Sequence, residues 1–212
     1  SVVIPVFNEE LVLHEFYPRL KKEAESWGKS YEILFVDDGS TDNSLELICK
    51  WKKVDSNIRV IKFTRNFGQQ AAVLAGFRES RGNIVVQIDS DLQNPPEEIK
   101  RLLDAFTDEI DLVVTTPRKR RDSSLRIIGS KALHFLAQAL FGNRFKLNLS
   151  SFRAMRRSVI EKIDQCQDRS RYMAVLMSWM AVPTVNVEVD HHSRKIGQTK
   201  YGVLPLLRLT WD

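Results

Sequence analysis

The chain has few of the residues that build small domains stapled by disulfides or zinc. Only two cysteines occur among its 212 residues, Cys49 and Cys166, and neither belongs to a Cys-x-x-Cys pair. The sequence therefore argues against a disulfide framework and a structural zinc site, and it fits a reducing compartment. With 43% hydrophobic residues the chain is long enough for one substantial core, so we expect a single domain over residues 1–212.

Long hydrophobic runs and the common phosphate-binding loops are also missing. No stretch approaches the ~20 uncharged apolar residues that span a bilayer, so we expect no transmembrane segment within residues 1–212. No initiator methionine or signal peptide precedes the first apolar run, and we expect the sequence to be trimmed at both ends. Neither a Walker-type loop nor Gly-x-Gly-x-x-Gly follows that run. Any nucleotide phosphates would therefore be held by a metal and side chains.

Acidic residues are scarce in the second half of the chain. Residues 1–116 carry 14 Lys and Arg against 20 Asp and Glu, whereas residues 117–212 carry 18 against 7, for a net charge of +5. An acidic front joined to a cationic back suits a phosphorylated substrate and an anionic acceptor or surface. Charge alone is equally consistent with nucleic acid or with a solvated basic surface.

Apolar runs alternate with helical patterns along the chain. Strands are predicted at residues 2–5, 31–36, 59–63, 83–88, 111–115 and 182–189. Helices are predicted at residues 8–29, 45–51, 69–79, 96–106, 127–141 and 172–180, with mixed strand and helix at 152–163. The strands are continuous apolar runs, which is typical of a parallel sheet covered by helices on both faces, so we expect an α/β fold.

Acidic residues follow three of the predicted strands, as Glu9-Glu10, Asp37-Asp38 and Asp89-Ser90-Asp91. Ligands of parallel α/β sheets bind beyond the carboxyl ends of the strands, where all three clusters lie. Asp89, Asp91 and Gln93 supply hard oxygen ligands and predict a Mg²⁺ or Mn²⁺ site that holds a diphosphate. The alternative is that Asp89 and Asp91 only cap the helix that Pro95 and Pro96 announce.

The segment beyond Thr116 differs in character. A basic loop at residues 117–122 precedes the predicted helix at 127–141, whose apolar face would pack in a core or dock on lipid. Residues 203–211, with Arg208 and Trp211, are typical of an interfacial amphipathic segment, although a core helix would give the same pattern. We therefore expect an anionic membrane surface as a partner.

Several motifs occur in order along nearly the whole chain. They are Val3-Ile4-Pro5-Val6-Phe7-Asn8-Glu9, Val36-Asp37-Asp38-Gly39-Ser40-Thr41-Asp42, Arg65-Asn66-Phe67-Gly68, Asp89-Ser90-Asp91-Leu92-Gln93-Asn94-Pro95-Pro96-Glu97 and Arg194-Lys195-Ile196-Gly197-Gln198-Thr199-Lys200-Tyr201. Together they resemble the family-two glycosyltransferases with the GT-A fold. The likeness is to the branch that glycosylates polyprenyl phosphates, such as dolichol-phosphate mannosyltransferases and bactoprenol glucosyltransferases.

The resemblance implies a Rossmann-like, mostly parallel sheet, with a nucleotide-sugar half at residues 1–116 and an acceptor half at 117–212. It implies an inverting, metal-dependent hexosyltransferase that uses a nucleotide sugar, a UDP-sugar by analogy, and undecaprenyl phosphate. The catalytic domain would act at the cytoplasmic face of the bacterial inner membrane, with a transmembrane region beyond residue 212. A homo-oligomer is compatible with the sequence, and no nucleic acid is expected as a partner.

The resemblance also assigns roles to matching residues. Contacts to the base and ribose fall to Pro5, Phe7, Glu9, Val36, Asp38 and Arg65. The metal and diphosphate fall to Asp89, Ser90, Asp91 and Gln93, and the cations that face donor or lipid phosphates are Arg118, Lys131, Arg194 and Lys200. Among these, Asp91, Arg118 and Lys200 are the predicted catalytic residues.

One departure and three rival functions stay open. Bactoprenol glucosyltransferases tend to carry an acidic residue just before Phe-Arg, whereas this chain has Ser151 before Phe152 and Arg153. Either Asp91 with the metal suffices, because an ionised phosphate acceptor needs no strong general base, or the acceptor geometry differs. A soluble enzyme acting on a glycan would typically carry a late acidic pair, which is not found after residue 117. A sugar-nucleotide pyrophosphorylase would need a Gly-rich basic loop after the first strand, but residues 6–10 contain no glycine and no cation. A basic nucleic-acid-binding module would leave the acidic clusters unused.

Overall fold

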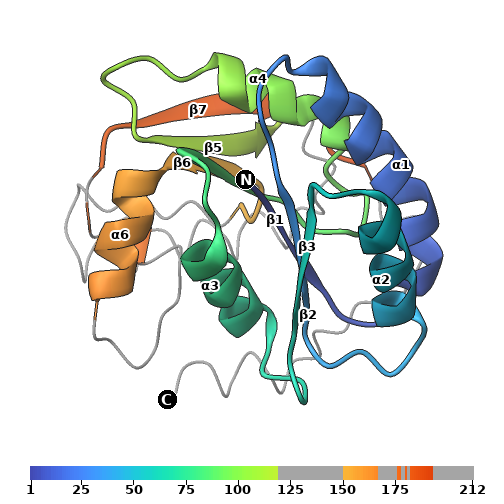
Figure 1. The fold of residues 1–212 in the computed structure, drawn as a ribbon. Coiled ribbons are helices and arrows are strands. Elements are labelled where there is room, and N and C mark those ends of the chain that lie inside the picture. The colour runs from blue at the N-terminus through green and yellow to red at the C-terminus, as the bar shows by residue number, and fades with distance from the viewer. Residues whose placement is uncertain (119–149, 167–175, 178–179, 181, 193–212) are drawn as a thin grey trace, which may run out of the picture.

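The structure is a computed structural model that describes residues 1–118, 150–166, 176, 177, 180 and 182–192. Its described residues form a seven-stranded sheet in the order β3-β2-β1-β4-β6-β5-β7 (Figure 1). The strands are β1 (Val2–Val6), β2 (Ile33–Asp37), β3 (Ile58–Lys62), β4 (Ile84–Gln87), β5 (Leu112–Pro117), β6 (Arg153–Arg156) and β7 (Thr184–Val189).

Strand direction decides which loops meet at each edge of the sheet. β1 runs parallel to β2 and β4, β2 to β3, and β5 to β7, whereas β6 runs antiparallel to both of its neighbours, β4 and β5. The carboxyl ends of the six parallel strands therefore share one edge, together with the start of β6. Gln87 lies opposite Arg153 at that edge.

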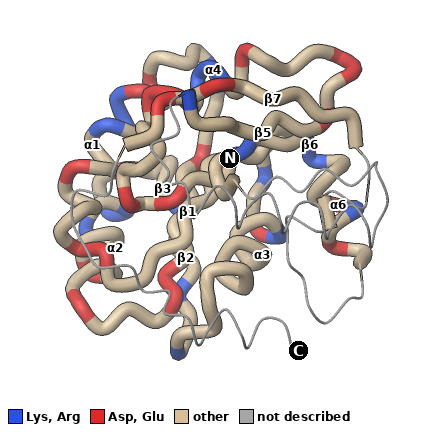
Figure 2. Tube along the Cα trace, turned by 180° about the vertical axis from the view of Figure 1, so that it is seen from behind, with Lys and Arg blue, Asp and Glu red and all other residues tan. Residues whose placement is uncertain are grey.

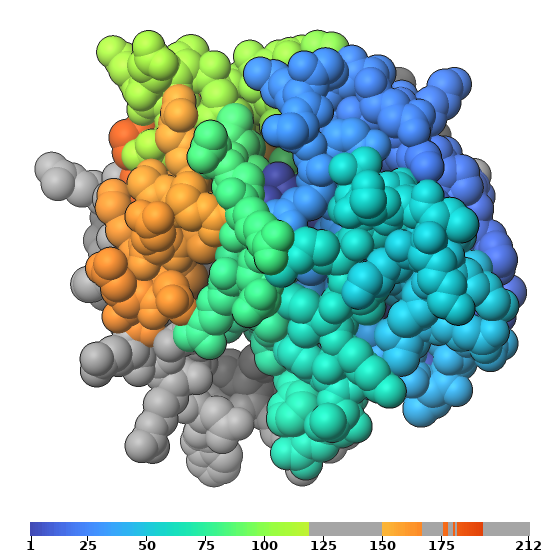
Figure 3. All heavy atoms as spheres, viewed as in Figure 1, coloured from blue at the N-terminus to red at the C-terminus, as the bar shows by residue number. Residues whose placement is uncertain are grey.

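Helices cover both faces of the sheet. The helices are α1 (Glu10–Ser26), α2 (Ser44–Val54), α3 (Gln69–Glu79), the 3-10 turn η1 (Pro96–Glu98), α4 (Ile99–Asp104) and α6 (Arg157–Gln165). On one face, α1, α2 and α4 pack on alternate strand residues such as Ile4 and Phe35. On the other face, α3 and α6 pack on the intervening residues such as Val3 and Leu34. Figures 1 and 3 show α3 and α6 side by side on this second face.

The apolar sequence pattern explains the two-sided core. All five residues of β1 and of β2 are buried, because each side chain faces a helix layer on one side or the other. In α1, the residues Val12, Leu13 and Phe16 face the sheet while Leu11 is 69% exposed. In α3, a Cβ on Gly76 would clash with Val3, so this glycine allows the helix to lie close to β1.

The structure confirms the predicted α/β fold with a mostly parallel sheet, and it corrects two details. The short strand β6 lies between β4 and β5 and reverses direction, which the mixed pattern at residues 152–163 did not reveal. The predicted helix at residues 96–106 begins as the 3-10 turn η1, with proline at its first position, and continues as the short helix α4, which ends at Asp104. Within the described residues, no helix is long and apolar enough to cross a membrane.

Candidate functional site

The loops after β1 and β2 are joined through Asn8. This residue has a positive φ of 54°, and its Oδ1 accepts the N–H of Thr41 at 2.7 Å. Its own N–H donates to Ser40 Oγ at 3.0 Å, and the N–H of Glu9 donates to Ser44 Oγ at 2.9 Å. Hydrogen bonds therefore join the loops that carry the first two acidic clusters, Glu9-Glu10 and Asp37-Asp38, at the carboxyl edge of the sheet. We call these two joined loops the platform.

Asp38 anchors the loop that precedes α3. Its Oδ1 accepts the N–H of Phe67 at 2.7 Å, and its Oδ2 accepts the N–H of Gly68 at 2.9 Å. Desolvation raises the pKa of Asp38, the two N–H donors lower it, and the neighbouring carboxylate of Asp37 raises it further. Asp37 is fully buried, and neither of its carboxylate oxygens has a hydrogen-bond partner within the described residues.

Gly39 permits the close approach between this loop and β2. Its φ is 70°, and a Cβ there would lie 2.5 Å from the backbone carbon of Arg65. Only glycine meets both conditions. Beyond it, the guanidinium of Arg65 lies 4.8 Å above the ring of Phe67, which is 53% exposed. The backbone of Arg65 therefore lies against Gly39, next to Asp38 in sequence, while its guanidinium packs on Phe67.

Asp89 is held from two sides. Its Oδ1 accepts Nε2 of Gln69, the first residue of α3, at 2.7 Å. Its Oδ2 accepts Oγ of Ser151, just before β6, at 2.6 Å. Desolvation is the largest cause that raises the pKa of Asp89, and the nearby Asp91 raises it further, while Ser151, Gln69 and Arg153 act in the opposite direction.

The start of α3 joins the second and third acidic clusters. Phe67 and Gly68 hold Asp38, and the next residue, Gln69, holds Asp89. The two carboxylates leave different strands, β2 and β4, with β1 between them. The partial positive charge of a helix N-terminus favours anions at this position. The acidic residues that the sequence separates thus converge on one place in the fold.

The turn that follows Asp89 presents the second carboxylate. Oδ1 of Asp91 accepts the N–H of Gln93 at 3.0 Å, and Leu92 between them has a φ of 59°. The capping alternative is wrong for these residues, because Pro95 occupies the N-cap of η1 and no side-chain cap is present there. The turn holds the carboxylate of Asp91 near enough to Asp89 to raise the pKa of Asp89.

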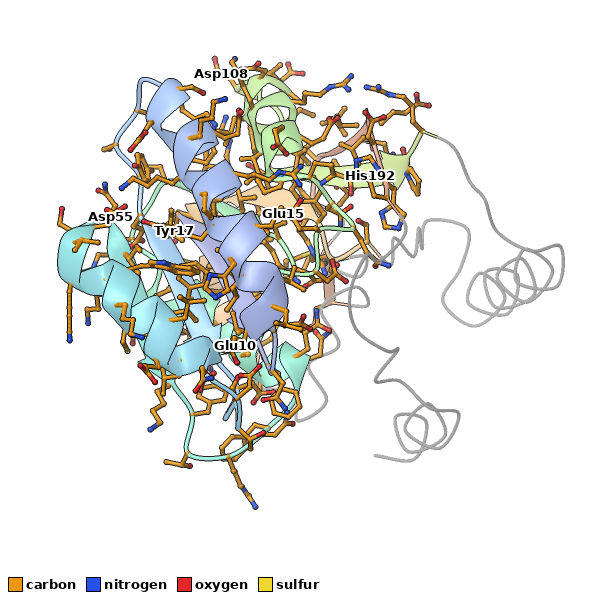
Figure 4. The ribbon with its side chains drawn as sticks, turned by 90° about the vertical axis from the view of Figure 1, so that its right-hand side faces the viewer. Glu10, Glu15, Tyr17, Asp55, Asp108 and His192 are labelled. Carbon is orange, nitrogen blue, oxygen red and sulfur yellow. The ribbon has the colours of Figure 1, made fainter. Side chains whose placement is uncertain are left out.

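Residues after β7 contact this turn and were not predicted from the sequence. The N–H of His192 donates to the carbonyl of Gln93 at 2.9 Å, and Nδ1 of His191 lies 3.3 Å from Oδ1 of Asn94. Figure 4 shows His192 next to the end of β7. Arg118, at the end of β5, forms a 3.1 Å ion pair with Asp190. The segment after β7 is thereby linked to the predicted metal turn.

Sequence analysis also missed Gln69, Ser151 and the buried Arg153. Nη1 of Arg153 donates to Sδ of Met177 at 3.0 Å, and the guanidinium lies near enough to Asp89 to lower its pKa. Gln69 and Ser151 are separated from Asp89 by 20 and 62 residues. The available signal was limited to the predicted helix start at residue 69 and the serine in place of an acidic residue.

The remaining predicted residues are placed as follows. Pro5, Val36 and Ser90 are buried, and Phe7 and Glu9 are half-buried at the end of β1 and the loop after it. Lys131, Arg194 and Lys200 lie outside the described residues, as do the predicted helix at 127–141, most of that at 172–180 and the segment at 203–211.

The oxygen donors fit a divalent cation that arrives with its ligand. Within the described residues, no group of three or more His, Cys, Asp or Glu forms a metal cluster. Magnesium in nucleotide sites is usually bound by one or two carboxylates, with waters and phosphates completing its shell. Asp89 and Asp91, which interact electrostatically, with Gln93 in the same turn, match this limited donor set.

Comparison with known proteins identifies the family. The model of glycosyl transferase family 2 matches residues 1–164. Undecaprenyl-phosphate 4-deoxy-4-formamido-L-arabinose transferases of Salmonella paratyphi B and Salmonella newport are each 39% identical over an alignment of 213 positions. The alignment covers 100% of this chain and 65% of each relative, so the chain spans about two thirds of their length.

Solved structures of low sequence identity share the fold. A mannosyltransferase from Pyrobaculum calidifontis in complex with GDP-mannose and Mn²⁺ has a TM-score of 0.64 at 16% identity, covering 88% of this chain and 54% of the other. Glucosyl-3-phosphoglycerate synthase from Mycobacterium tuberculosis with Mn²⁺, UDP-glucose and glycerol 3-phosphate has a TM-score of 0.60 at 22% identity, covering 100% and 76%. With the family model and the relatives above, the chain belongs to glycosyl transferase family 2.

Proposed function

We propose that this protein transfers a sugar from a nucleotide sugar, a UDP-sugar, to undecaprenyl phosphate. The observation that carries the proposal is the convergence of Asp38 and Asp89 on the start of α3, with Asp91 in the adjoining turn. Relatives at 39% identity over the whole chain are named for a transfer to undecaprenyl phosphate.

The donor would lie along the carboxyl edge of the sheet. Its base and ribose would contact Asp38 of the platform, Arg65 and the end of β1, including Pro5, Phe7, Glu9 and Val36. Its diphosphate would lie at the turn formed by Asp89, Ser90, Asp91 and Gln93, which would hold Mg²⁺ or Mn²⁺. A cation bound there would neutralise negative charge on the diphosphate leaving group.

The acceptor chemistry follows from its charge. A lipid phosphate is ionised at neutral pH, so its oxygen attacks the anomeric carbon without a strong general base. Cations must offset the repulsion between two phosphate groups, and we assign this role to Arg118, Lys131, Arg194 and Lys200. Arg118 already lies at this edge, held by Asp190, from which it would turn to the acceptor. In a single in-line displacement, the bond from the acceptor oxygen to the anomeric carbon forms as the bond to the nucleoside diphosphate breaks, and the anomeric configuration inverts.

The proposal includes a place of action and an open question about the sugar. Residues 117–212 would face the lipid, and the catalytic domain would work on the cytoplasmic face of the bacterial inner membrane. The predicted hexose is one candidate sugar. The relatives are named for 4-deoxy-4-formamido-L-arabinose, a pentose, so both classes belong in the test.

The test combines nucleotide binding with transfer. Calorimetry with UDP and GDP in Mn²⁺ would identify the base, and a panel of UDP-hexoses and UDP-4-deoxy-4-formamido-L-arabinose would then be offered with undecaprenyl phosphate. We expect UDP preference, loss of transfer in EDTA and an inverted product anomer. Transfer to a glycan but not to the lipid phosphate would contradict the acceptor, and a retained anomer would contradict the single displacement.

A further inference from the structure

The hydrogen bonds on Asp89 use both of its oxygens and come from two separate elements. Gln69 at the start of α3 donates to Oδ1, and Ser151 before β6 donates to Oδ2. Each carboxylate oxygen has about two lone-pair sites, so one site on each oxygen is used and the other stays available. A carboxylate held in this way has a fixed rotamer while it can still bind a further group.

The orientation of Asp89 depends on these two donors. Arg153 lies near enough to lower the pKa of Asp89, but within the described residues the hydrogen bonds to this carboxylate come from Gln69 and Ser151, and the carboxylate is strongly desolvated. A desolvated carboxylate turns toward whichever donors are within reach. Hydrogen bonds to ligating carboxylates fix their geometry in metal sites in the same manner.

Two adjacent serines make different contacts. Oγ of Ser150 lies 2.7 Å from Oγ1 of Thr115 and 3.3 Å from the N–H of Phe152, so it ties β5 to the start of β6. Oγ of Ser151 instead reaches Asp89. Because β6 is antiparallel to β4, its first residues arrive at the carboxyl end of β4, where Asp89 lies.

We propose that Gln69 and Ser151 are positioning residues that clamp Asp89 in the geometry that accepts a divalent cation together with a nucleotide diphosphate. The inference rests on the proposed function and adds two residues outside the family motifs described above. Gln69 follows directly on Phe67 and Gly68, so the clamp also fixes the distance between Asp89 and Asp38. One helix start therefore sets the spacing between the base end and the phosphate end of the donor site.

The experiment measures UDP affinity in Mn²⁺ and in EDTA by calorimetry and takes the ratio of the two constants. The variants are Ser151→Ala, Ser151→Thr, Gln69→Leu and, as the matched control, Ser150→Ala. Loss of a hydrogen-bond partner behind a metal ligand lowers metal affinity by about 10- to 100-fold. We expect the ratio to fall by this factor in Ser151→Ala and in Gln69→Leu, and to stay within about threefold of the native value in Ser151→Thr and Ser150→Ala.

The outcomes separate the clamp from the proposed function. Native ratios in both Ser151→Ala and Gln69→Leu would overturn the clamp while leaving metal-dependent UDP binding in place. A native protein whose UDP affinity is the same in Mn²⁺ and in EDTA would overturn the proposed donor site and the clamp with it. If Ser151→Ala and Gln69→Leu lowered UDP affinity equally in EDTA and in Mn²⁺, the two residues would have a structural role only. The same conclusion would follow if Ser150→Ala lowered the ratio as much as Ser151→Ala. Thermal melting of every variant identifies any that do not fold. If Ser151→Ala does not fold, a lowered ratio in Gln69→Leu with a native ratio in Ser151→Thr supports the clamp, and a native ratio in Gln69→Leu overturns it.

Discussion

Carboxylates at the two edges of the sheet are treated in opposite ways. At the amino edge, Glu32 accepts bonds from Ser1 Oγ at 2.6 Å, from Arg59 at 2.9 Å and from the N–H of Arg81 at 2.6 Å. Desolvation alone would raise the pKa of Glu32, but these donors lower it below its usual range. The charge of Glu32 is therefore compensated within the protein.

The charge of Asp55, between α2 and β3, is compensated in the same way. It accepts the hydroxyl of Tyr17 at 2.8 Å, the N–H of Asn57 at 3.0 Å and the ammonium of Lys21 at 3.1 Å. Burial acts to raise the pKa of Asp55, and the three donors together lower it. Figure 4 shows Tyr17 and Asp55 between α1 and α2. The ring of Tyr17 also stacks on Trp51, with centroids 4.3 Å apart.

The carboxyl edge lacks this compensation. Desolvation raises the pKa of both Asp38 and Asp89 in spite of two hydrogen bonds each, and neither has an ion pair among the described residues. Ion pairs elsewhere are common, and Figure 2 shows basic and acidic positions close together along α1 and around α4. The two edges therefore differ in the direction in which the pKa of their carboxylates moves, and carboxylates with a raised pKa are common at functional sites.

The largest effect is expected from Asp91→Ala, which tests the function of the carboxyl edge directly. Loss of a preorganised electrostatic group lowers activity by about 10²- to 10³-fold, and we expect Mn²⁺-dependent UDP binding and sugar transfer to fall at least this far. Asp91 is half-buried in a turn, so the melting temperature should change little. Native activity of this variant in the presence of EDTA would refute the metal assignment.

Gly39→Ala breaks the carboxyl edge without changing a charge. A left-handed conformation with a Cβ costs about 1–2 kcal/mol, and the clash with the Arg65 backbone adds about 1–3 kcal/mol. We expect a lower free energy of unfolding in urea and weaker UDP binding. Gly28→Ala is the matched control, because its φ is 61° but nothing lies within 4 Å of the added Cβ. Equal losses in the two variants would contradict the close-approach argument.

Asp55→Ala tests the amino edge. It leaves the buried hydroxyl of Tyr17 without its acceptor, which costs about 1–3 kcal/mol. We expect the free energy of unfolding to fall by this amount while UDP affinity in Mn²⁺ stays native. A loss of nucleotide binding in a folded Asp55→Ala protein would show that the two edges are not independent.

The pH dependence of stability should report the amino edge. The pKa of Asp55 and of Glu32 is lowered in the folded state, so the unfolded chain binds more protons once the pH nears their ordinary values of about 4. Their stabilisation is fully present above that pH and is lost as the pH falls through the lowered folded values. Urea unfolding from pH 7 to 3 should show this fall, and Asp55→Asn should reduce it. A slope that is unchanged by Asp55→Asn would assign the acid sensitivity to other groups.

The smallest effect is expected from Lys100→Gln on the surface of α4. Lys100 and Asp104 form a 2.8 Å ion pair, but both side chains are more than half exposed. Such helix pairs contribute about 0.2–0.5 kcal/mol, so unfolding and UDP binding should stay native within error. A change above about 1 kcal/mol in the free energy of unfolding would mean that exposed ion pairs contribute as much as the buried carboxylates at the edges of the sheet.

Much of the fold and part of the site could be predicted from sequence because both follow from local pattern. Continuous apolar strands predicted a mostly parallel sheet, and parallel strands necessarily bring Asp38 and Asp89 to one edge. The four-residue strand β6 could not be oriented, since so short a segment, with arginine at both ends, carries no information on direction. The roles assigned to Pro5, Arg65, Asp91 and the other site residues stay predictions that the binding experiments test.

The sequence by itself determined the alternating strands and helices, the positions of the acidic clusters at strand ends and the resemblance to a family, because each is written in consecutive residues. Only the tertiary structure decided that Gln69 and Ser151 would meet at Asp89 and that His192 would contact the turn at Gln93. These contacts join residues 20 to 99 positions apart. Their donors are ordinary polar side chains and backbone groups, whose partners are set by strand order and not by residue type.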